Sequence, residues 1–108
     1  PLDMDTILNS VAKTGRLIVV DTDWTSCGVS AEIVARAAEQ LQDSKRPRMQ
    51  RMGYEPVTCP TTKNLEDLFY PNPQKIAAAA YSMVHDNGSS WSPRQVDAPE
   101  VVQFKGPF

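Results

Sequence analysis

The stretch that decides the fold is residues 17–41, with the sequence LIVVDTDWTSCGVSAEIVARAAEQL. Its first four residues are apolar and mostly β-branched, which predicts a buried strand covered on both faces. A polar loop over residues 21–28 follows, and residues 29–41 then carry an apolar side chain at every fourth position, which indicates a helix. A buried strand that leads through a short loop into a helix is half of a β-α-β unit. The sequence therefore predicts an α/β fold, with this loop at the carboxyl end of the strand, where ligands and partners bind in such folds.

The segments on either side predict a helix before this unit and a strand after it. Asp3 is a suitable N-cap for the helix, and Gly15 is a suitable left-handed residue at its end. Residues 48–53 alternate polar and apolar side chains, which indicates a second strand with one face buried. Arg48 and Arg51 lie on opposite faces of such a strand, so we interpret them as solvated rather than as an anion site.

Two more helical segments are predicted before the pattern ends. Residues 63–70 have room for one or two helical turns, and Asn72 followed by Pro73 marks the start of the last helix. The residues of the short segment expected to turn inward are Leu65, Leu68 and Phe69. We assign residues 1–86 to the domain and residues 87–108 to a linker and C-terminal tail, in which residues 100–104 can add an edge strand.

This sheet is too small for its helices. Two confident strands, with a third in the tail, accompany three main helices, whereas a layered α/β domain needs several parallel strands covered on both faces. Unpaired strand edges are avoided by natural proteins or used for association. The sequence therefore predicts an incomplete α/β domain that pairs with another chain or belongs to a larger domain.

Composition excludes several classes of function. The formal charge of −2, with both signs interspersed, gives no reason to expect nucleic acid or an anionic membrane as a partner. No apolar stretch has the roughly 20 residues needed to span a bilayer, and no signal peptide is expected. Cys27 and Cys59 form no metal-ligand spacing, and His85 is the only histidine, so we expect neither a zinc site nor a histidine-dependent triad.

Four short segments and the end of the chain carry a family resemblance. They are residues 1–7 (PLDMDTI), 13–21 (KTGRLIVVD), 27–33 (CGVSAEI), 65–67 (LED) and 104–108 (FKGPF). In this order and spacing they resemble the C-terminal (transketolase C-terminal) domain of the beta chain of thiamine-diphosphate-dependent 2-oxo acid dehydrogenases. That group includes pyruvate, branched-chain 2-oxo acid and acetoin dehydrogenases. The resemblance implies a three-layer α/β/α fold with a mostly parallel sheet, of which this chain holds the second half.

The resemblance also limits the chemistry expected of the chain. In the family, thiamine diphosphate and its divalent metal, Mg, are held by the alpha chain, and the activating glutamate lies upstream in the beta chain. The family's Gly-Asp-Gly…Asn cofactor motif does not occur in this sequence. We therefore expect the chain to bind no cofactor and to be inactive by itself, although it is part of an oxidoreductase. The sequence does not identify the 2-oxo acid.

The partners that the resemblance implies are the dehydrogenase alpha chain, a second beta chain and the acyltransferase core. In some members the terminal carboxylate of the beta chain helps to bind that core, and this carboxylate maps to Phe108 here. By itself the chain is expected to form a homo-oligomer. The expected location is the cytoplasm, or the mitochondrial matrix in a eukaryote.

The loop departs from the family pattern at two places. The family commonly has glutamate where Thr22 stands and Gly-Gly where Cys27-Gly28 stands. Gly28 keeps the close backbone approach at the helix start. Cys27 places a thiol beside the positive end of a helix, where it can be reactive, but we interpret it as a small packed residue in place of glycine.

Three functions remain open at this point. The first is a segment that assembles a dehydrogenase beta chain, with Trp24, Cys27 and Gly28 as a corner that contacts another domain or subunit. The second is a stand-alone protein-interaction module that uses its exposed strand edge. The third is a small enzyme with Asp21, Asp23 and Cys27 as the reactive set, which lacks the oriented base that nucleophilic catalysis needs.

Overall fold

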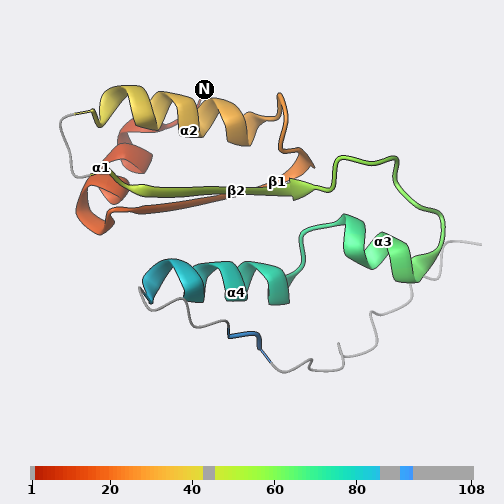
Figure 1. Ribbon diagram of the computed structural model, residues 1–108. Helices are drawn as coiled ribbons and strands as arrows, with labels where there is room; N and C mark the ends of the chain where they lie inside the picture. The colour runs from red at the N-terminus through yellow and green to blue at the C-terminus, as the bar shows by residue number, and fades with distance from the viewer. Residues whose placement is uncertain (1, 43–45, 86–90, 94–108) are drawn as a thin grey trace, which may run out of the picture.

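The fold is a small parallel sheet with helices on both faces. The computed structural model describes residues 2–42, 46–85 and 91–93. Its elements, in chain order, are α1 (Met4–Thr14), β1 (Arg16–Trp24), α2 (Val29–Gln40), β2 (Arg48–Tyr54), α3 (Lys63–Phe69) and α4 (Pro73–Val84). The two strands are parallel neighbours, with α1 and α2 on one side and α4 on the other (Figure 1). The predicted incomplete α/β fold is confirmed.

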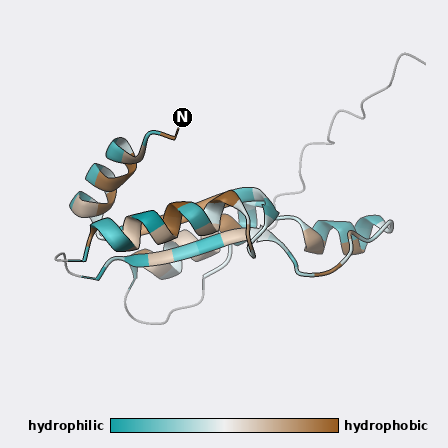
Figure 2. Cartoon of the chain, turned by 90° about the horizontal axis from the view of Figure 1, so that it is seen from above, coloured by the Kyte–Doolittle hydropathy of each residue, from teal (hydrophilic) through white to brown (hydrophobic). Residues whose placement is uncertain are grey.

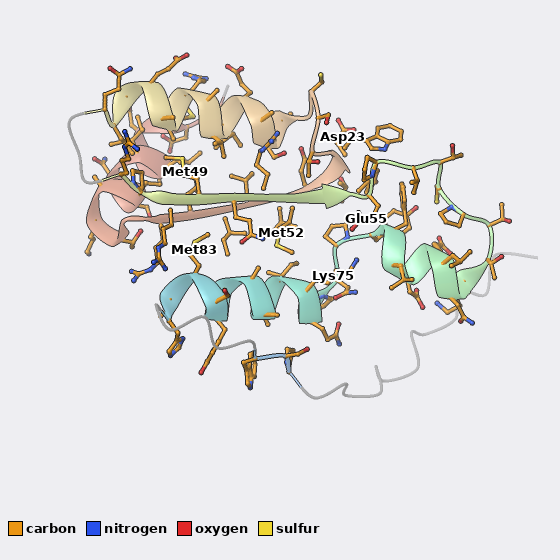
Figure 3. The ribbon with its side chains drawn as sticks, in the orientation of Figure 1. Asp23, Met49, Met52, Glu55, Lys75 and Met83 are labelled. Atoms are coloured by element: carbon orange, nitrogen blue, oxygen red, sulfur yellow. The ribbon has the colours of Figure 1, made fainter. Side chains whose placement is uncertain are left out.

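Seen from above, α2 runs along the strands, whereas α3 lies beyond their carboxyl ends (Figure 2). The strand side chains alternate between the two helical layers: Met49 points toward α2, and Met52 points toward α4 (Figure 3). The buried apolar residues come mostly from the facing sides of α1 and α2; they are Met4, Val11, Ile33, Ala37, Phe69 and Met83. The core therefore lies chiefly between these two helices and the sheet.

β1 is longer than predicted and carries a bulge. Pairing runs in register from Arg16 opposite Arg48 to Val20 opposite Met52, and it resumes at Trp24 opposite Tyr54. Four steps along β1 therefore match two steps along β2, and the extra residues of β1 are accommodated as a bulge. The prediction that the loop begins at residue 21 is wrong, because pairing with Tyr54 draws the chain after the bulge back into the sheet. The loop before α2 is limited to residues 25–28.

Several apolar residues that were predicted to be buried are exposed. Val20 in β1 is 43% exposed, so this strand is not covered completely on both faces. Val29 at the start of α2 is 58% exposed, and Leu65 and Leu68 in α3 are 53% and 59% exposed. The helical periodicity of α2 and α3 is correct, but Val29, Leu65 and Leu68 are more than half exposed within the described part of the chain.

Local signals set the ends of α1 and α4 as predicted. Asp3 caps α1 by accepting a hydrogen bond from the Thr6 amide at 3.1 Å, and Gly15 ends it with φ 67°. Asn72 caps α4 by accepting from the Lys75 amide at 2.8 Å. The N-cap of α2 is Gly28, so the sequence interpretation that Thr25 or Ser26, two polar residues of the preceding loop, could cap this helix is wrong.

Arginines of both strands fix the layers to one another. The Arg16 Nε and the Arg48 Nη1 donate hydrogen bonds to the Met83 carbonyl in the last turn of α4, at 3.0 and 3.3 Å. Arg51 points the other way and donates to the Thr25 carbonyl in the loop before α2. The predicted opposite orientation of Arg48 and Arg51 is confirmed, and each side chain satisfies a backbone carbonyl that lies outside a helix ladder.

The longest helices of the described ranges, α2 and α4, have 12 residues each, which is too few to cross the hydrocarbon core of a bilayer.

Candidate functional site

The bulge in β1 turns the Asp21 side chain toward the start of α2. Its Oδ2 accepts a hydrogen bond from the Ser30 amide at 3.3 Å. Gly28 has no side chain with which to cap the helix, so the Asp21 carboxylate supplies the missing acceptor from the neighbouring strand. A negative group at this position also interacts favourably with the helix dipole. Asp21 therefore stabilises the corner between β1 and α2.

Replacing Asp21 with alanine should lower the free energy of unfolding by about 1 kcal/mol, the usual cost of losing a helix N-cap. Urea denaturation followed by circular dichroism measures this. Asp23→Ala is the matched control, because the Asp23 Oδ1 accepts a local hydrogen bond from the amide of the next residue, Trp24, at 2.7 Å, and does not cap α2. Equal losses in the two variants would contradict the capping role of Asp21.

Cys27 and Gly28 form a tight turn at this corner. Cys27 is exposed and has φ 63°, in the left-handed region that favours glycine. The interpretation of Cys27 as a packed residue is therefore wrong, although its backbone conformation is the one that a glycine adopts readily. Gly28 lies so close to the Trp24 carbonyl that a Cβ would collide with its oxygen. The corner thus needs glycine at position 28 for space, and it holds a non-glycine at position 27.

An aromatic cluster lies beside this corner, at the carboxyl end of the sheet. Trp24 meets Tyr54 edge-on, with ring centroids 6.0 Å apart. Tyr54 stacks on Phe69 at 4.8 Å and meets Tyr70 edge-on at 5.2 Å. We call Trp24, Tyr54, Phe69 and Tyr70 the aromatic cluster. Phe69 is buried, but Trp24 and Tyr70 are 47% and 36% exposed, so the cluster has a face in contact with solvent.

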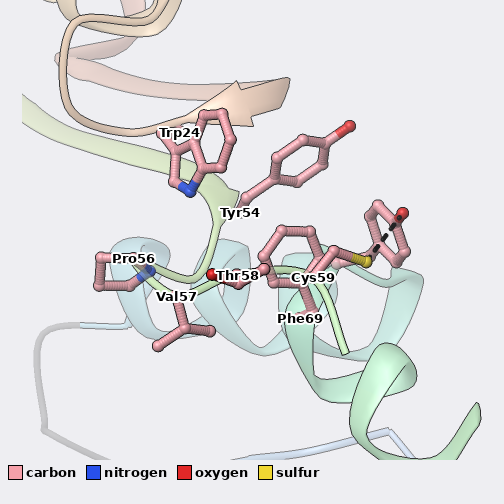
Figure 4. Close-up of a pocket in the computed structure, with 8 residues that line it drawn as sticks. Trp24, Tyr54, Pro56, Val57, Thr58, Cys59 and Phe69 are labelled. Atoms are coloured by element: carbon pink, nitrogen blue, oxygen red, sulfur yellow. Dashed lines mark hydrogen bonds between the residues drawn. The ribbon is translucent and has the colours of Figure 1, made fainter. Parts of the chain in front are cut away.

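The aromatic cluster forms one side of a pocket of about 790 Å³ (Figure 4). The other side is the loop after β2, whose lining residues are Pro56, Val57, Thr58 and Cys59. Below the loop, the Lys75 ammonium donates a hydrogen bond to the Leu68 carbonyl at 2.6 Å and lies 4.0 Å from Glu55, so α4 is connected to both sides of the pocket. The pocket is mainly apolar, which suits the contact of a hydrophobic group.

Within the pocket the Cys59 sulfur lies 3.6 Å from the Tyr70 hydroxyl, the contact that is dashed in Figure 4. This hydrogen bond, together with repulsion between the two groups once they are ionised, raises the pKa of Tyr70 above its ordinary value of 10.0. Because the folded pKa is the higher one, this contribution to stability is present below pH 10 and is lost as the pH rises through the folded pKa.

Replacing Cys59 with alanine should therefore move the pKa of Tyr70 downward, toward 10.0. Ultraviolet absorbance titration measures it when Tyr54 and Tyr81, the other two tyrosines, are replaced by phenylalanine. Thr58→Ala is the control, since Thr58 lines the same pocket and makes no hydrogen bond to Tyr70. An unchanged titration in the Cys59 variant would show that another interaction raises this pKa.

The structure brings Trp24, Cys27 and Gly28 together at one corner, and their contact with another domain or subunit stays a prediction. Phe108 lies outside the described residues, as does the predicted edge strand over residues 100–104. In the described ranges, no group of three or more His, Cys, Asp or Glu side chains could hold a metal ion. The carboxylates of Asp21 and Asp23 both accept backbone hydrogen bonds, so neither is arranged as a base for the Cys27 thiol.

Sequence reasoning missed three members of the aromatic cluster: Tyr54, Phe69 and Tyr70. The available signal was their placement at both ends of the connection of residues 55–68, which consists of the proline-containing loop and most of α3. Aromatic residues that flank such a connection come together when its ends meet, and here the Glu55 amide donates a hydrogen bond to the Phe69 carbonyl at 3.1 Å.

Comparison with known proteins gives one family and a consistent set of relatives. The family described as "Transketolase, C-terminal domain" matches residues 1–76. The acetoin:2,6-dichlorophenolindophenol oxidoreductase subunit beta of Cupriavidus necator is 40% identical over 80 residues, which are 74% of this chain and 24% of that protein. The mitochondrial pyruvate dehydrogenase E1 component subunit beta of Saccharomyces cerevisiae is 39% identical over 80 residues, which are 73% of this chain and 22% of that protein. The pyruvate dehydrogenase E1 component subunit beta of Rickettsia bellii is 35% identical over 79 residues, which are 73% of this chain and 24% of that protein. The chain thus spans about a quarter of the length of these relatives.

Proposed function

Since the chain belongs to the transketolase C-terminal domain family, we propose that it is the assembly segment of the beta chain of a thiamine-diphosphate-dependent 2-oxo acid dehydrogenase. The observation that carries the proposal is the partly exposed aromatic cluster at the carboxyl end of a sheet with only two described strands. Aromatic side chains dominate the energetics of protein interfaces when they are buried at the centre of a contact. The relatives named as beta subunits support the same assignment.

The proposed contact corner consists of Trp24, Cys27 and Gly28, and its partners are the dehydrogenase alpha chain and a second beta chain. Trp24 is the anchor, because its exposed ring is held against Tyr54 and loses little freedom on binding. Cys27 and Gly28 shape the turn beside it. At the end of the chain, the Phe108 carboxylate is assigned to the acyltransferase core. In isolation the chain forms a homo-oligomer through the same surfaces.

The oxidative decarboxylation of a 2-oxo acid belongs in this proposal to the whole complex. The described residues do not fit thiamine diphosphate or Mg, because they offer neither a cluster of metal ligands nor the family's cofactor motif. The chain positions neighbouring subunits in this proposal. Residues 1–86 are its domain, and residues 87–108 are its linker and tail. The proposed location is the cytoplasm of a bacterium or the mitochondrial matrix of a eukaryote, and mitochondrial forms are among the named relatives.

The test is binding to the matching alpha chain, with the upstream part of the beta chain restored. Trp24→Ala should weaken the complex at least 30-fold, as expected for a buried aromatic anchor. Trp91→Ala is the control: Trp91 is similarly exposed, at 45%, but it packs on Tyr81 of α4, away from the corner. Absence of a complex at micromolar concentration with the unsubstituted chain would contradict the assembly role itself.

A second candidate is a stand-alone interaction module, which is favoured by the outer edges of β1 and β2. Both edges lack a strand neighbour within the described residues. An unpaired edge presents backbone donors and acceptors that can pair with another chain. Light scattering tests the self-association that both candidates predict: a dimer or larger species is expected, and a compact, stable monomer would contradict it.

A further inference from the structure

The outer edge of β1 is an open sheet edge within the described ranges. The sheet has two described strands, and β1 pairs with β2 along one side. The helices lie on the faces of the sheet, with α1 and α2 on one face and α4 on the other (Figure 1). Val20, in the middle of β1, is 43% exposed. A strand edge of this kind presents backbone N–H and C=O groups to which another strand can add.

Hydrogen bonds at the start of β1 show which of its backbone groups face outward. The Arg48 amide of β2 donates to the Gly15 carbonyl at 2.9 Å, so this carbonyl faces β2. In a trans peptide the N–H points opposite to the C=O, so the Arg16 N–H faces the outer edge. Backbone groups alternate between the two edges along a strand. Ile18 and Val20 therefore face outward as well, and the residues between them face β2.

The first of the outward-facing residues is held by its own chain. The Thr14 Oγ1 accepts a hydrogen bond from the Arg16 amide at 3.3 Å and lies 3.1 Å from the Arg16 carbonyl oxygen. Within the described part of the chain, the outward groups of Ile18 and Val20 have no corresponding contact. After Val20 the bulge interrupts the regular strand. The open part of the edge is therefore the N–H and C=O groups of Ile18 and Val20.

We propose that a second copy of this chain adds to this edge in antiparallel orientation, with Val19 on the two-fold axis. In this register Ile18 of each copy lies opposite Val20 of the other, and each such pair exchanges both N–H···O bonds. All of the open groups are then used. A register centred on Ile18 would place Val20 opposite Arg16, whose backbone the Thr14 side chain already holds. A register centred on Val20 would place Ile18 opposite the bulge.

The charges of β1 favour the antiparallel orientation over the parallel one. Arg16 lies at the amino end of the strand, and Asp21 and Asp23 lie toward its carboxyl end. Antiparallel pairing places the basic end of each strand beside the acidic end of the other, whereas parallel pairing brings like charges together. The contact corner stays accessible, because the Trp24 ring packs against Tyr54 of β2, on the side away from the outer edge.

The outer edge of β2 suits this pairing less well. Three of its seven residues are exposed and polar, namely Arg48, Gln50 and Arg51, and charged side chains protect the edges of natural sheets. The inference rests on the second candidate function above, the interaction module, and adds to it the edge, the partner and the register.

Cross-linking between identical positions tests the register. In a Cys27→Ser, Cys59→Ser background, Val19→Cys places two thiols on the two-fold axis, in a pair with Cα atoms about 4.5 Å apart, which a disulfide can span. Leu17→Cys is the matched control: position 17 faces the same side of the sheet, but its copy lies about 13 Å further along the strands. Mild oxidation should therefore form the covalent dimer about tenfold faster in Val19→Cys than in Leu17→Cys.

Removal of an outward donor tests the edge itself. Val20→Pro deletes an N–H that faces away from β2, so the pairing with β2 is kept. Each dimer loses two hydrogen bonds, and its dissociation constant should rise about 30-fold. Light scattering over a concentration series measures this, with circular dichroism to confirm that the variant is folded. Val20→Thr is the control, because it keeps the N–H and the branched side chain and should preserve the dimer.

The contrary results separate this inference from the functions proposed above. Equal rates in Val19→Cys and Leu17→Cys would overturn the register, whether or not Val20→Pro folds. An equally stable dimer of folded Val20→Pro would overturn the use of the β1 edge and leave self-association in place. A monomer at every concentration would overturn both this inference and the self-association of the second candidate. Binding to the alpha chain remains the separate test of the assembly role.

Discussion

Replacing Gly53 with alanine is expected to lower the free energy of unfolding by about 3 kcal/mol, near the upper end of the usual cost of overpacking. Gly53 lies in β2 opposite the bulge of β1, and a Cβ there would collide with the Asp23 carbonyl oxygen. The colliding atom belongs to the backbone, so it cannot rotate aside as a side chain would. Because small domains are stabilised by only about 5 kcal/mol, the variant should be largely unfolded at moderate urea concentrations.

Gly15→Ala is the matched control for Gly53→Ala. Gly15 has φ 67°, so alanine is strained there, but no atom lies within 4 Å of its added Cβ. The expected loss is about 1 kcal/mol, from the left-handed backbone alone. Urea denaturation curves of both variants measure the difference. A loss at Gly53 no larger than the loss at Gly15 would contradict the close approach of the two strands.

The elements that the sequence predicted correctly are those whose limits depend on neighbouring residues. Helix α1 begins at the Asp3 cap and ends at Gly15, and α4 begins after Asn72 with Pro73 in its first turn. Each of these signals acts through hydrogen bonds or dihedral angles within one helical turn, so the local sequence is sufficient. The family resemblance added the parallel order of the strands, which the structure confirms.

The end of β1 could not be predicted, because it depends on a strand that lies about 30 residues further along the chain. The residues Asp21, Thr22 and Asp23 are typical of turns, yet they stay in the strand since Trp24 pairs with Tyr54. The exposure of Leu65 and Leu68 has a related cause. A helical pattern shows which side of a helix is apolar, but burial also needs a surface opposite that side.

Only part of the candidate site could be predicted, because most of its residues also meet through contacts between distant parts of the chain. Trp24 stood out because it follows a predicted strand, whereas Tyr54, Phe69 and Tyr70 contact it only after the sheet has formed and the loop has closed. The role of Asp21 as the acceptor for α2 was also hidden, because its partner Ser30 is nine residues away and is brought near by the bulge. Side chains that meet through tertiary packing leave no periodic signal in the sequence.

Adjacent substitutions at the corner before α2 should have very different effects on stability. Gly28→Ala is expected to cost about 2 to 3 kcal/mol, because its Cβ would collide with the Trp24 carbonyl oxygen and displace the N-cap of α2. Cys27→Gly should leave stability unchanged or raise it by up to about 1 kcal/mol. There the release of left-handed strain at φ 63° is offset by the greater freedom of glycine in the unfolded chain.

Thermal and urea denaturation of the two single variants and of the double variant test this pair. If the strain at Cys27 and the contact at Gly28 are independent, the effects of the two substitutions should add. The double variant should then lose as much stability as Gly28→Ala alone, less any stability that Cys27→Gly gains. A large loss of stability in Cys27→Gly would show that the thiol makes a stabilising contact, in spite of its exposed position.

The same corner holds Trp24, so Gly28→Ala should also weaken binding of the restored beta chain to its alpha chain, whereas Cys27→Gly should preserve that binding. A stable, folded Gly28→Ala protein that binds normally would separate the turn from the proposed contact surface.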